Sequence, residues 1–370
     1  MATDKKIQSF HPAGKPAKRA IPSLWARAEH YFSPIDFAMV MATGILSIAA
    51  LQEGYTWLAW SLYIFNVAIF ILLLIFMAQR LLFQWHSFVR AFKSYDKGPT
   101  VFTFIIGLCM IGNEVILFNN WLVIGKIVLT LAVAVWLIIN YGFFFYVTTT
   151  NHKKSLKDGI SGSWLLTVVS IQAIAILIIY CSTGSQTAIF VATCLFFTGC
   201  VFYLYLMSLI VYRISFFELH ARDLGAAYWI NMGATAITTL AGALLLINGK
   251  DFHLIAALVP FIKGLSLVFW SAGSWWIPLL VMLGIWRHGV RKIKTPVTAS
   301  GYSPTYWAFV FPLGMYTACT YRLSETLDLD FLKIIPKYFI FIALATWAAV
   351  LIGCFRHLLI KVPLRDRQQS

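Results

Sequence analysis

Ten long apolar segments constrain the fold of this chain more than any other feature of its sequence. A helix needs about 20 apolar residues to cross the hydrocarbon core of a bilayer, which is about 30 Å thick. Pro260 and Pro278 interrupt the overlong eighth segment, so its outer end could be a separate interfacial segment. We predict membrane-spanning helices at 34–51, 57–78, 100–118, 121–147, 161–181, 186–212, 226–247, 257–286, 303–321 and 332–355.

The composition agrees with a membrane protein. Hydrophobic residues make up 60% of the 370 residues, charged residues make up only 12%, and the mean hydropathy is +0.79. Ordinary soluble domains are about 25% charged. We therefore predict an all-α integral membrane protein with its ten helices in residues 33–358. Residues 1–32 form a cytoplasmic tail with an interfacial lead-in, and residues 359–370 form a second cytoplasmic tail.

The apolar segments alternate in polarity along the chain. Odd-numbered segments contain Gly, Ser, Thr and Asn, as in 39–44, 111–113, 230–239 and 311–317, whereas even-numbered segments are almost purely hydrocarbon. Polar residues inside a membrane usually face the interior of the helix bundle or a water-filled cavity. We therefore predict that the odd-numbered helices face a polar path and that the even-numbered helices face lipid.

The basic residues are distributed asymmetrically about these segments. All but six of the 29 Lys and Arg residues fall in the tails or in the connections that follow even-numbered segments. Basic residues in short loops mark the cytoplasmic side. We therefore place both termini in the cytoplasm and predict a bacterial inner membrane. The net charge of +15 already follows from this topology, so it gives no reason to expect nucleic acid as a partner.

Several kinds of chemistry are disfavoured by the residues present. The six cysteines are irregularly spaced, without a CxxC pair, and no histidine lies in the middle of a predicted span. Metal, disulfide and histidine proton-relay chemistry are therefore not expected. The phosphate-binding motif of ATPases is absent, so we expect no cofactor and no transport driven by ATP within this chain. The spans also lack the paired catalytic groups that an intramembrane enzyme would need.

The first and ninth segments repeat each other at a constant offset of 270 residues. The pattern Ser-Pro-x3-Ala-x-Val-x3-Gly occurs at 33–44 and again at 303–314. Serine is a favourable helix N-cap, and proline fits the first helical position because its missing N–H costs nothing there. The repeat predicts helical hairpins arranged around one axis.

The ninth segment carries the most informative local motif, Phe311 and Pro312 followed by Gly314. Proline removes the backbone bond to the carbonyl of Ala308, so we predict a kink at Pro312 and Gly314. At about 1.5 Å per residue, Phe311 lies roughly 12 Å above Ser303, near the membrane midplane. A bulky ring at this depth could plug a path.

Three blocks of sequence carry a resemblance to a known family. They are FAMVMATGILS at 37–47, YWINMGATAITTLAG at 228–242 and YWAFVFPLGMYTACTYRL at 306–323. Together they resemble the tellurite-resistance and dicarboxylate transporter family, and the likeness spans essentially 30–358. That family includes bacterial TehA, the yeast malate permease and sulfite efflux pump, and the plant slow-type anion channels.

The resemblance implies a specific architecture and function. It implies five helical hairpins in quasi-fivefold arrangement, a central pore formed by the odd-numbered helices, and a homotrimer with one pore per protomer. A phenylalanine on the ninth helix occludes the pore in this family, and Phe311 occupies the matching position. The expected function is a gradient-driven permease or channel that carries small anions across the lipid bilayer.

Hydroxyl and amide side chains can hold a passing anion without a full charge, so that binding stays weak enough for release. Serine and threonine can instead bond to the backbone of their own helix. The candidates for lining the pore and binding the anion are Thr43, Asn231, Thr235, Thr238 and Thr317.

Glu114 is an acidic residue inside a predicted span, and such residues are functional candidates. Counted from Thr100, it lies about 21 Å along the helix, in the outer third of the membrane. It could pair with a basic residue such as Lys126 or Lys263, or be wetted by an outer vestibule. Alternatively, it could take up a proton when an anion crosses, which would make the chain a coupled carrier.

The sequence leaves the transported anion open. The alternative to a channel is a proton-coupled carrier of C4 dicarboxylates such as malate, or a carrier of sulfite or tellurite on the same fold. Similarity of fold does not decide among these substrates.

Overall fold

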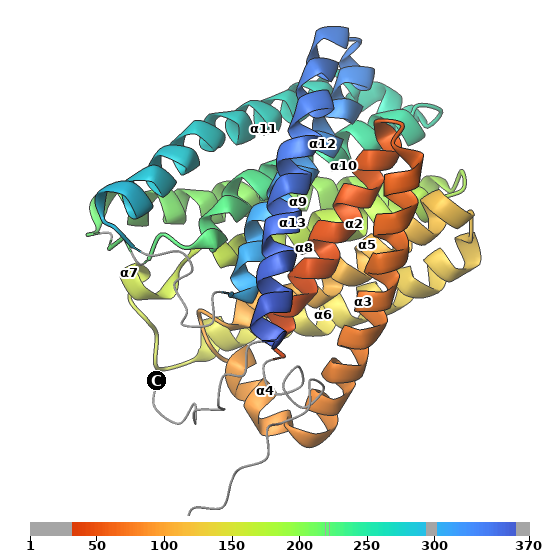
Figure 1. Ribbon diagram of the computed structural model, residues 1–370. Helices are drawn as coiled ribbons and strands as arrows, with labels where there is room; N and C mark the ends of the chain where they lie inside the picture. Colours follow the sequence, from red (N-terminus) through yellow and green to blue (C-terminus); the bar gives the residue numbers. More distant parts are fainter. Residues whose placement is uncertain (1–31, 219, 222, 294–301, 360–370) are drawn as a thin grey trace, which may run out of the picture.

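The structure is a computed structural model that describes residues 32–218, 220–221, 223–293 and 302–359. These residues form helices and no strands. Ten of the helices are 16 residues or longer (Figure 1). Within the described residues, nine helices are long and apolar enough to cross a membrane. The chain is thus an all-α multi-pass membrane protein, and the tenth crossing, by the less apolar helix α12, stays a prediction.

The long helices form five hairpins of consecutive helices, joined by short loops. Two short helices, α4 (Trp85–Phe92) and α7 (Leu156–Gly159), lie between hairpins. The hairpins are α2 (Phe37–Gln52) with α3 (Thr56–Phe83), α5 (Phe102–Asn119) with α6 (Leu122–Thr149), α8 (Leu166–Cys181) with α9 (Gln186–Phe216), α10 (Ile230–Asn248) with α11 (His253–Ile285), and α12 (Trp307–Leu327) with α13 (Ile334–Leu359).

The first helices of the five hairpins form a closed inner ring. α2 contacts α5, α5 contacts α8, α8 contacts α10, α10 contacts α12, and α12 returns to α2. Each inner helix also begins in the same way, with a single 3-10 turn, so the repeat predicted for the first and ninth segments extends to all five hairpins. The turns are Pro34–Asp36, Gly98–Val101, Gly162–Leu165, Ala226–Trp229 and Pro304–Tyr306.

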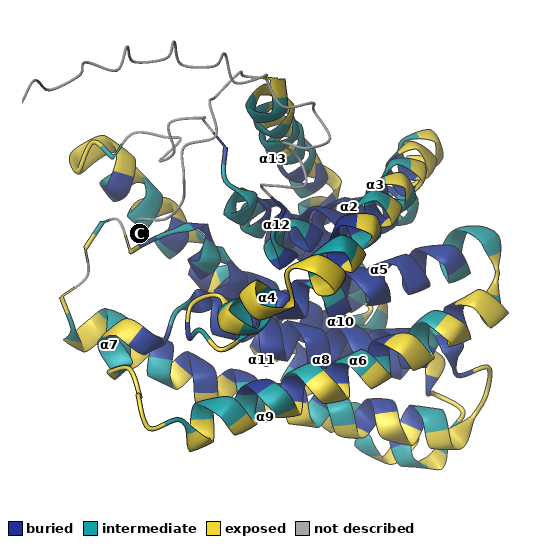
Figure 2. Cartoon of the chain, turned by 90° about the horizontal axis from the view of Figure 1, so that it is seen from below, coloured by how far each residue is buried: buried dark blue, intermediate teal, exposed yellow. Residues whose placement is uncertain are grey.

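The second helix of each hairpin packs on the outside of this ring (Figure 2). In the inner helix α8, every residue except Tyr180 is buried. The outer helix α6 buries only five residues, at 125, 132, 136, 140 and 143. Their spacing of three, four and seven places them on one stripe of the helix. The odd helices are therefore buried inside the bundle and the even helices lie outside, as predicted. That the odd helices face a polar path and the even helices face lipid stays a prediction.

Glycines allow the inner helices to approach one another closely. A Cβ atom at Gly314 of α12 would lie 2.8 Å from Cγ2 of Ile45 in α2, and one at Gly233 of α10 would lie 2.9 Å from Cγ of Pro312. Small residues are typical of such contacts in membranes. Gly314 therefore has a packing role, and α12 continues through Pro312 as one helix, Trp307–Leu327.

The eighth span is one continuous helix. α11 extends through both Pro260 and Pro278, and a π-helical turn, Trp286–Val290, continues it. The prediction of a separate interfacial segment is therefore wrong. Membrane helices tolerate proline because neighbouring groups and local adjustments satisfy the backbone groups that it frees. Four other predicted spans end too early. The helices α3, α9, α12 and α13 continue four to six residues beyond the predicted ends.

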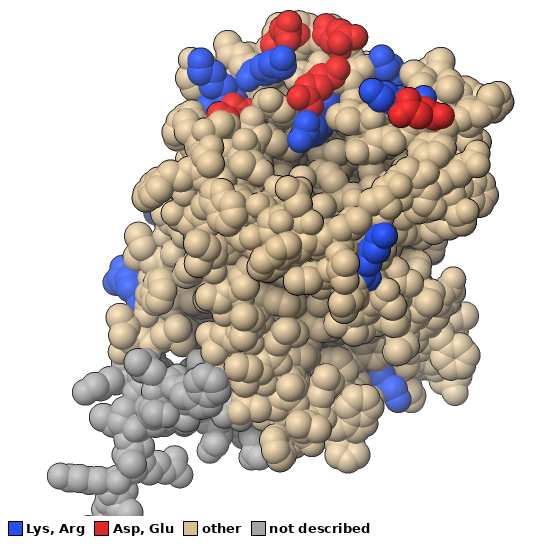
Figure 3. Space-filling model, turned by 90° about the vertical axis from the view of Figure 1, so that its right-hand side faces the viewer, with Lys and Arg blue, Asp and Glu red and all other residues tan. Residues whose placement is uncertain are grey.

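The described chain begins and ends on the same side of the bundle (Figure 1). We call this side, where the inner helices begin, the near end, and the opposite side the far end. On the face shown in Figure 3, most acidic and basic side chains gather at the top, and the surface below them is largely uncharged. The tails predicted at 1–32 and 359–370 lie outside the described residues, except for Phe32 and Leu359. Their cytoplasmic location stays a prediction.

Candidate functional site

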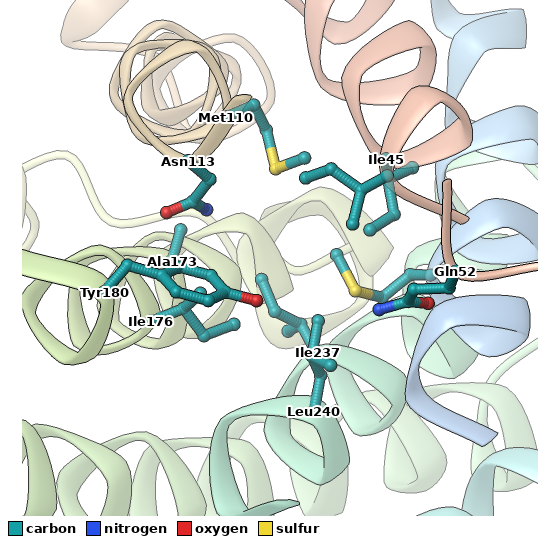
Figure 4. Close-up of a pocket in the computed structure, with 11 residues that line it drawn as sticks. Ile45, Gln52, Met110, Asn113, Ala173, Ile176, Tyr180, Ile237 and Leu240 are labelled. Atoms are coloured by element: carbon teal, nitrogen blue, oxygen red, sulfur yellow. The ribbon is translucent and has the colours of Figure 1, made fainter. Parts of the chain in front are cut away.

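Two cavities lie along the axis of the inner ring. The near cavity is lined by residues of all five inner helices, including Ala38, Thr103, Leu166, Ile230 and Phe311. The far cavity is also lined by all five, including Ile48, Asn113, Ile176, Leu240 and Met315 (Figure 4). Side chains from all members of a ring can meet only near its centre, so both cavities lie on the axis.

The barrier between the two cavities is short. On α2, Met41 lines the near cavity and Ile45 lines the far cavity. On α12, Phe311 lines the near cavity and Met315 lines the far cavity. Each pair is separated by four residues, about one helical turn or roughly 5.4 Å. Phe311 is only 2% exposed and is the last residue of α12 that lines the near cavity.

The far cavity combines apolar walls with three neutral polar groups. Asn113 of α5 is 3% exposed, and its Oδ1 has no hydrogen-bond partner within the described part of the chain. The same holds for both amide atoms of Gln52, at the end of α2. Tyr180 of α8 directs its hydroxyl toward the middle of the cavity (Figure 4).

Neither cavity has a Lys, Arg, Asp or Glu among its lining residues. Charged groups occur instead at the far end, where Arg322 and Glu325 form an ion pair of 2.8 Å. Glu53 follows α2 in the loop beside Gln52. Burial raises the pKa of the Glu53 carboxyl above its usual range, and attraction to Lys337 partly offsets this rise.

The threonines predicted to line a pore bond to their own helices. Thr235 donates its hydroxyl hydrogen bond to the carbonyl of Met232, Thr238 donates to Ala234, and Thr317 donates to Leu313. Thr235 also faces the outer helix α11, since a Cβ atom at Gly273 would lie 2.5 Å from its hydroxyl oxygen.

The two other candidates also lie away from the cavities. The hydroxyl of Thr43 accepts a hydrogen bond of 2.9 Å from the Trp347 indole of the outer helix α13. Asn231 is fully buried on α10, and neither amide atom has a partner among the described residues. None of the five candidates is among the residues that line either cavity. That they line the path of an anion therefore stays a prediction.

Sequence reasoning missed Gln52, Asn113 and Tyr180 as lining residues because it chose polar residues by type. Helical spacing contained a usable signal. Ile45, Ile48 and Gln52 follow one another at three and four residues on one face of α2, and Met110 and Asn113 do so on α5. A stripe of apolar residues at this spacing that ends in a polar residue indicates the inward face of the helix.

Glu114 lies beside Asn113 in the sequence but faces α2 and α3 rather than the axis. It is fully buried and accepts hydrogen bonds from Ser47 Oγ at 2.5 Å and Asn66 Nδ2 at 2.7 Å. It makes no ion pair among the described residues. The predicted pairing with Lys126 or Lys263 and the predicted wetting by a vestibule are therefore both wrong. Side chains of two neighbouring helices satisfy this carboxyl group.

Replacing Asn66 should destabilise the protein measurably. Asn66→Leu removes a donor from a fully buried carboxyl group, which costs about 1–3 kcal/mol or more. Asn140→Leu on the outer helix α6 is the matched control, because Asn140 is also buried but is not one of the hydrogen-bond donors to Glu114. We expect a lower unfolding temperature in detergent for Asn66→Leu than for Asn140→Leu. Equal unfolding temperatures would show that the Asn66 bond contributes nothing.

No group of three or more His, Cys, Asp or Glu side chains suited to a metal ion occurs in the described part of the chain. The buried inner ring and the apolar outer helices define a multi-pass membrane protein, with two cavities inside the ring. A family model described as voltage-dependent anion channel matches residues 31–355, and the chain belongs to this family. The resemblance seen in the sequence is thereby confirmed.

Individual relatives agree with this assignment. An uncharacterized membrane protein of Mycobacterium tuberculosis is 38% identical over 151 residues, which cover 41% of this chain and 74% of that protein. An uncharacterized transporter of Methanocaldococcus jannaschii is 25% identical over 331 residues, covering 85% and 92% of the two chains. A second transporter of that organism is 26% identical over 336 residues, covering 87% and 92%. The family match and the names of these relatives support a membrane anion transporter or channel, which is not a class of enzyme.

Proposed function

We propose that the chain is a gradient-driven channel or permease whose small anions pass along the axis of the inner ring. The observation that carries this proposal is the pair of cavities, each lined by all five inner helices and separated by about one helical turn. The path runs from the near cavity, past Phe311 and Met41, to the far cavity. The membership of an anion-channel family supplies the class of substrate.

The ring of Phe311 is the gate of this path. Its side chain is nearly completely buried, and the residues of α2 on either side of the break between the cavities, Met41 and Ile45, are apolar. A hydrophobic constriction stops ions by excluding water. Movement of one ring would therefore join the two cavities without a rearrangement of the helices. Gly314 and Pro312 hold α12 against its neighbours and so fix the backbone from which this ring projects.

A proton-coupled carrier of C4 dicarboxylates such as malate is the second candidate, and one observation favours it. Glu114 is fully buried, unpaired with any base in the described residues, and adjacent in sequence to Asn113 in the far cavity. A buried carboxyl group that binds and releases a proton could couple anion movement to a proton gradient. Sulfite and tellurite carriers remain variants of the same mechanism, and the homotrimer remains a prediction.

Flux measurements on the purified chain in liposomes separate the two candidates. We expect chloride efflux above that of protein-free liposomes at two pH values, without proton movement, and we expect Glu114→Gln to leave it within about twofold of the wild type. The control is Glu218→Gln, beyond the end of α9, which removes an exposed carboxylate that makes no ion pair among the described residues. Malate uptake that follows the proton gradient and is lost only in Glu114→Gln would contradict the channel and support the coupled carrier.

A further inference from the structure

Arg287 is a buried cation at the near end of the outer helix α11. It belongs to the π-helical turn Trp286–Val290 and is only 8% exposed. It takes part in none of the ion pairs that the described residues form. A buried charge without an opposite charge beside it is strongly unfavourable. Arg287 therefore calls for an anionic partner that these residues do not supply.

The groups around Arg287 satisfy its side chain only in part. Its Nη1 donates a hydrogen bond of 2.5 Å to the carbonyl oxygen of Leu224, in the connection between α9 and α10. Its Nε has no partner within the described part of the chain. Glu218 and Asp223 lie in the same connection, but neither forms an ion pair with Arg287. The carboxyl end of α11 offers only about half of a negative charge, so part of the positive charge stays uncompensated.

Two more basic residues follow Arg287 at the end of α11. Arg291 and Lys292 are both exposed. The guanidinium group of Arg291 lies 5.1 Å from the centroid of the Trp286 ring, over its face. Tryptophan is enriched at the level of the lipid headgroups, so Trp286 indicates that this turn lies at the surface of the bilayer. The positive charges of the turn are thus placed at the depth of the lipid phosphates.

The surface of α11 beside this turn is apolar. Val281, Met282 and Ile285 are exposed and, at spacings of three and four residues, share one face of the helix. A ligand that fits both features has an anionic group for the arginines and hydrocarbon chains for this face, as a phospholipid does. The basic residues predict that the near end faces the cytoplasm, and the cytoplasmic leaflet carries anionic lipids that bind to basic sites between membrane helices.

We propose that Arg287 and Arg291 bind the phosphate group of an anionic phospholipid at the near end of α11. Arginine suits this role because its planar guanidinium group can bind two phosphate oxygens through parallel N–H bonds. Nε of Arg287 is a donor that the described residues leave unused. The lipid supplies the missing negative charge, and its acyl chains lie along the apolar face of the helix. Because the site belongs to an outer helix, this inference does not rest on the proposed anion path.

Lipid binding to the purified full chain tests the site without requiring conduction. The unfolding temperature is measured in detergent against the concentration of added phosphatidylglycerol, which is anionic, or phosphatidylcholine, which is neutral overall. We expect phosphatidylglycerol to stabilise the wild type more than phosphatidylcholine does. Arg287→Gln should raise the half-saturating phosphatidylglycerol concentration about tenfold, equivalent to about 1.4 kcal/mol. Arg291→Gln, which changes an exposed side chain, should shift it in the same direction and guards against a folding defect in Arg287→Gln.

The matched control is Arg90→Gln, which removes an exposed basic side chain from the short helix α4. We expect its half-saturating concentration to stay within about twofold of the wild type. Inorganic phosphate should not replace the lipid, because it has no acyl chains for the face of α11. The proposal is overturned when phosphatidylglycerol stabilises no more than phosphatidylcholine, when inorganic phosphate stabilises the wild type equally, or when Arg287→Gln and Arg291→Gln respond to phosphatidylglycerol as the wild type does.

Discussion

Phe311→Ala is expected to raise the chloride current through the purified protein in planar bilayers by at least about tenfold, which requires a barrier lowered by about 1.4 kcal/mol. The ring is 2% exposed and lines the near cavity, and in the proposed path it is the gate. Replacing it with a methyl group opens space between two cavities that are separated by about one helical turn. Water can then enter the constriction, and an anion no longer loses its whole hydration shell there.

The control for this variant is Phe309→Ala on the same helix. Phe309 is partly exposed, and its ring lies 5.2 Å from that of Trp229, centroid to centroid, outside the residues that line the near cavity. Its replacement should leave the current within about twofold of the wild type. An equal rise in both variants, or a folded Phe311→Ala protein with wild-type current, would show that Phe311 is not the gate.

Gly162→Ala is expected to cause a large loss of folded protein. A Cβ atom at this position would lie 2.3 Å from the carbonyl oxygen of Ala227 and 3.0 Å from the Cα atom of Tyr228. Both are backbone atoms in the 3-10 turn Ala226–Trp229 that precedes α10, so no side-chain rotation relieves the clash. The cost should be about 3 kcal/mol, the upper part of the range for overpacking.

Gly264→Ala provides a matched control, because Gly264 lies in the middle of α11 and a Cβ atom there meets nothing within 4 Å. Alanine is a better helix former than glycine, so this change should be neutral or slightly stabilising. The measurement is the unfolding temperature and the yield of monodisperse protein in detergent. Similar values for Gly162→Ala and the wild type would mean that the inner helices separate more easily than their contacts indicate.

Most of the fold could be predicted from the sequence because a bilayer imposes a length and a polarity on each helix. The ten predicted segments correspond to the ten long helices, and the alternation of polarity identified the inner ring. Helix ends were harder to place. α3 continues to Phe83 through Arg80, beyond the apolar segment itself, and hydropathy cannot register such an extension. The two prolines of α11 led to the wrong prediction of a break in this helix. The effect of a proline depends on neighbouring groups that the sequence does not reveal.

The candidate site was harder to predict than the fold. Phe311 was predicted as the gate through the family resemblance, because an aromatic residue in a membrane helix is by itself most often a packing residue, and the gate stays a prediction. The threonines were chosen for their chemistry, but their hydroxyls bond to their own backbone, as those of Thr235 and Thr317 do. The partners of Glu114 lie 48 and 67 residues away in the sequence. Only the packing of α2, α3 and α5 brings them together.

Because every inner helix is the first of its hairpin, all five run through the bundle in the same direction. Their amino ends surround the near cavity and their carboxyl ends surround the far cavity. A helix has partial positive charge at its amino end and partial negative charge at its carboxyl end. Five parallel dipoles therefore impose a field along the path that no ionised side chain has to supply. An anion is attracted at one mouth and repelled at the other, so we expect the current to rectify when the voltage is reversed.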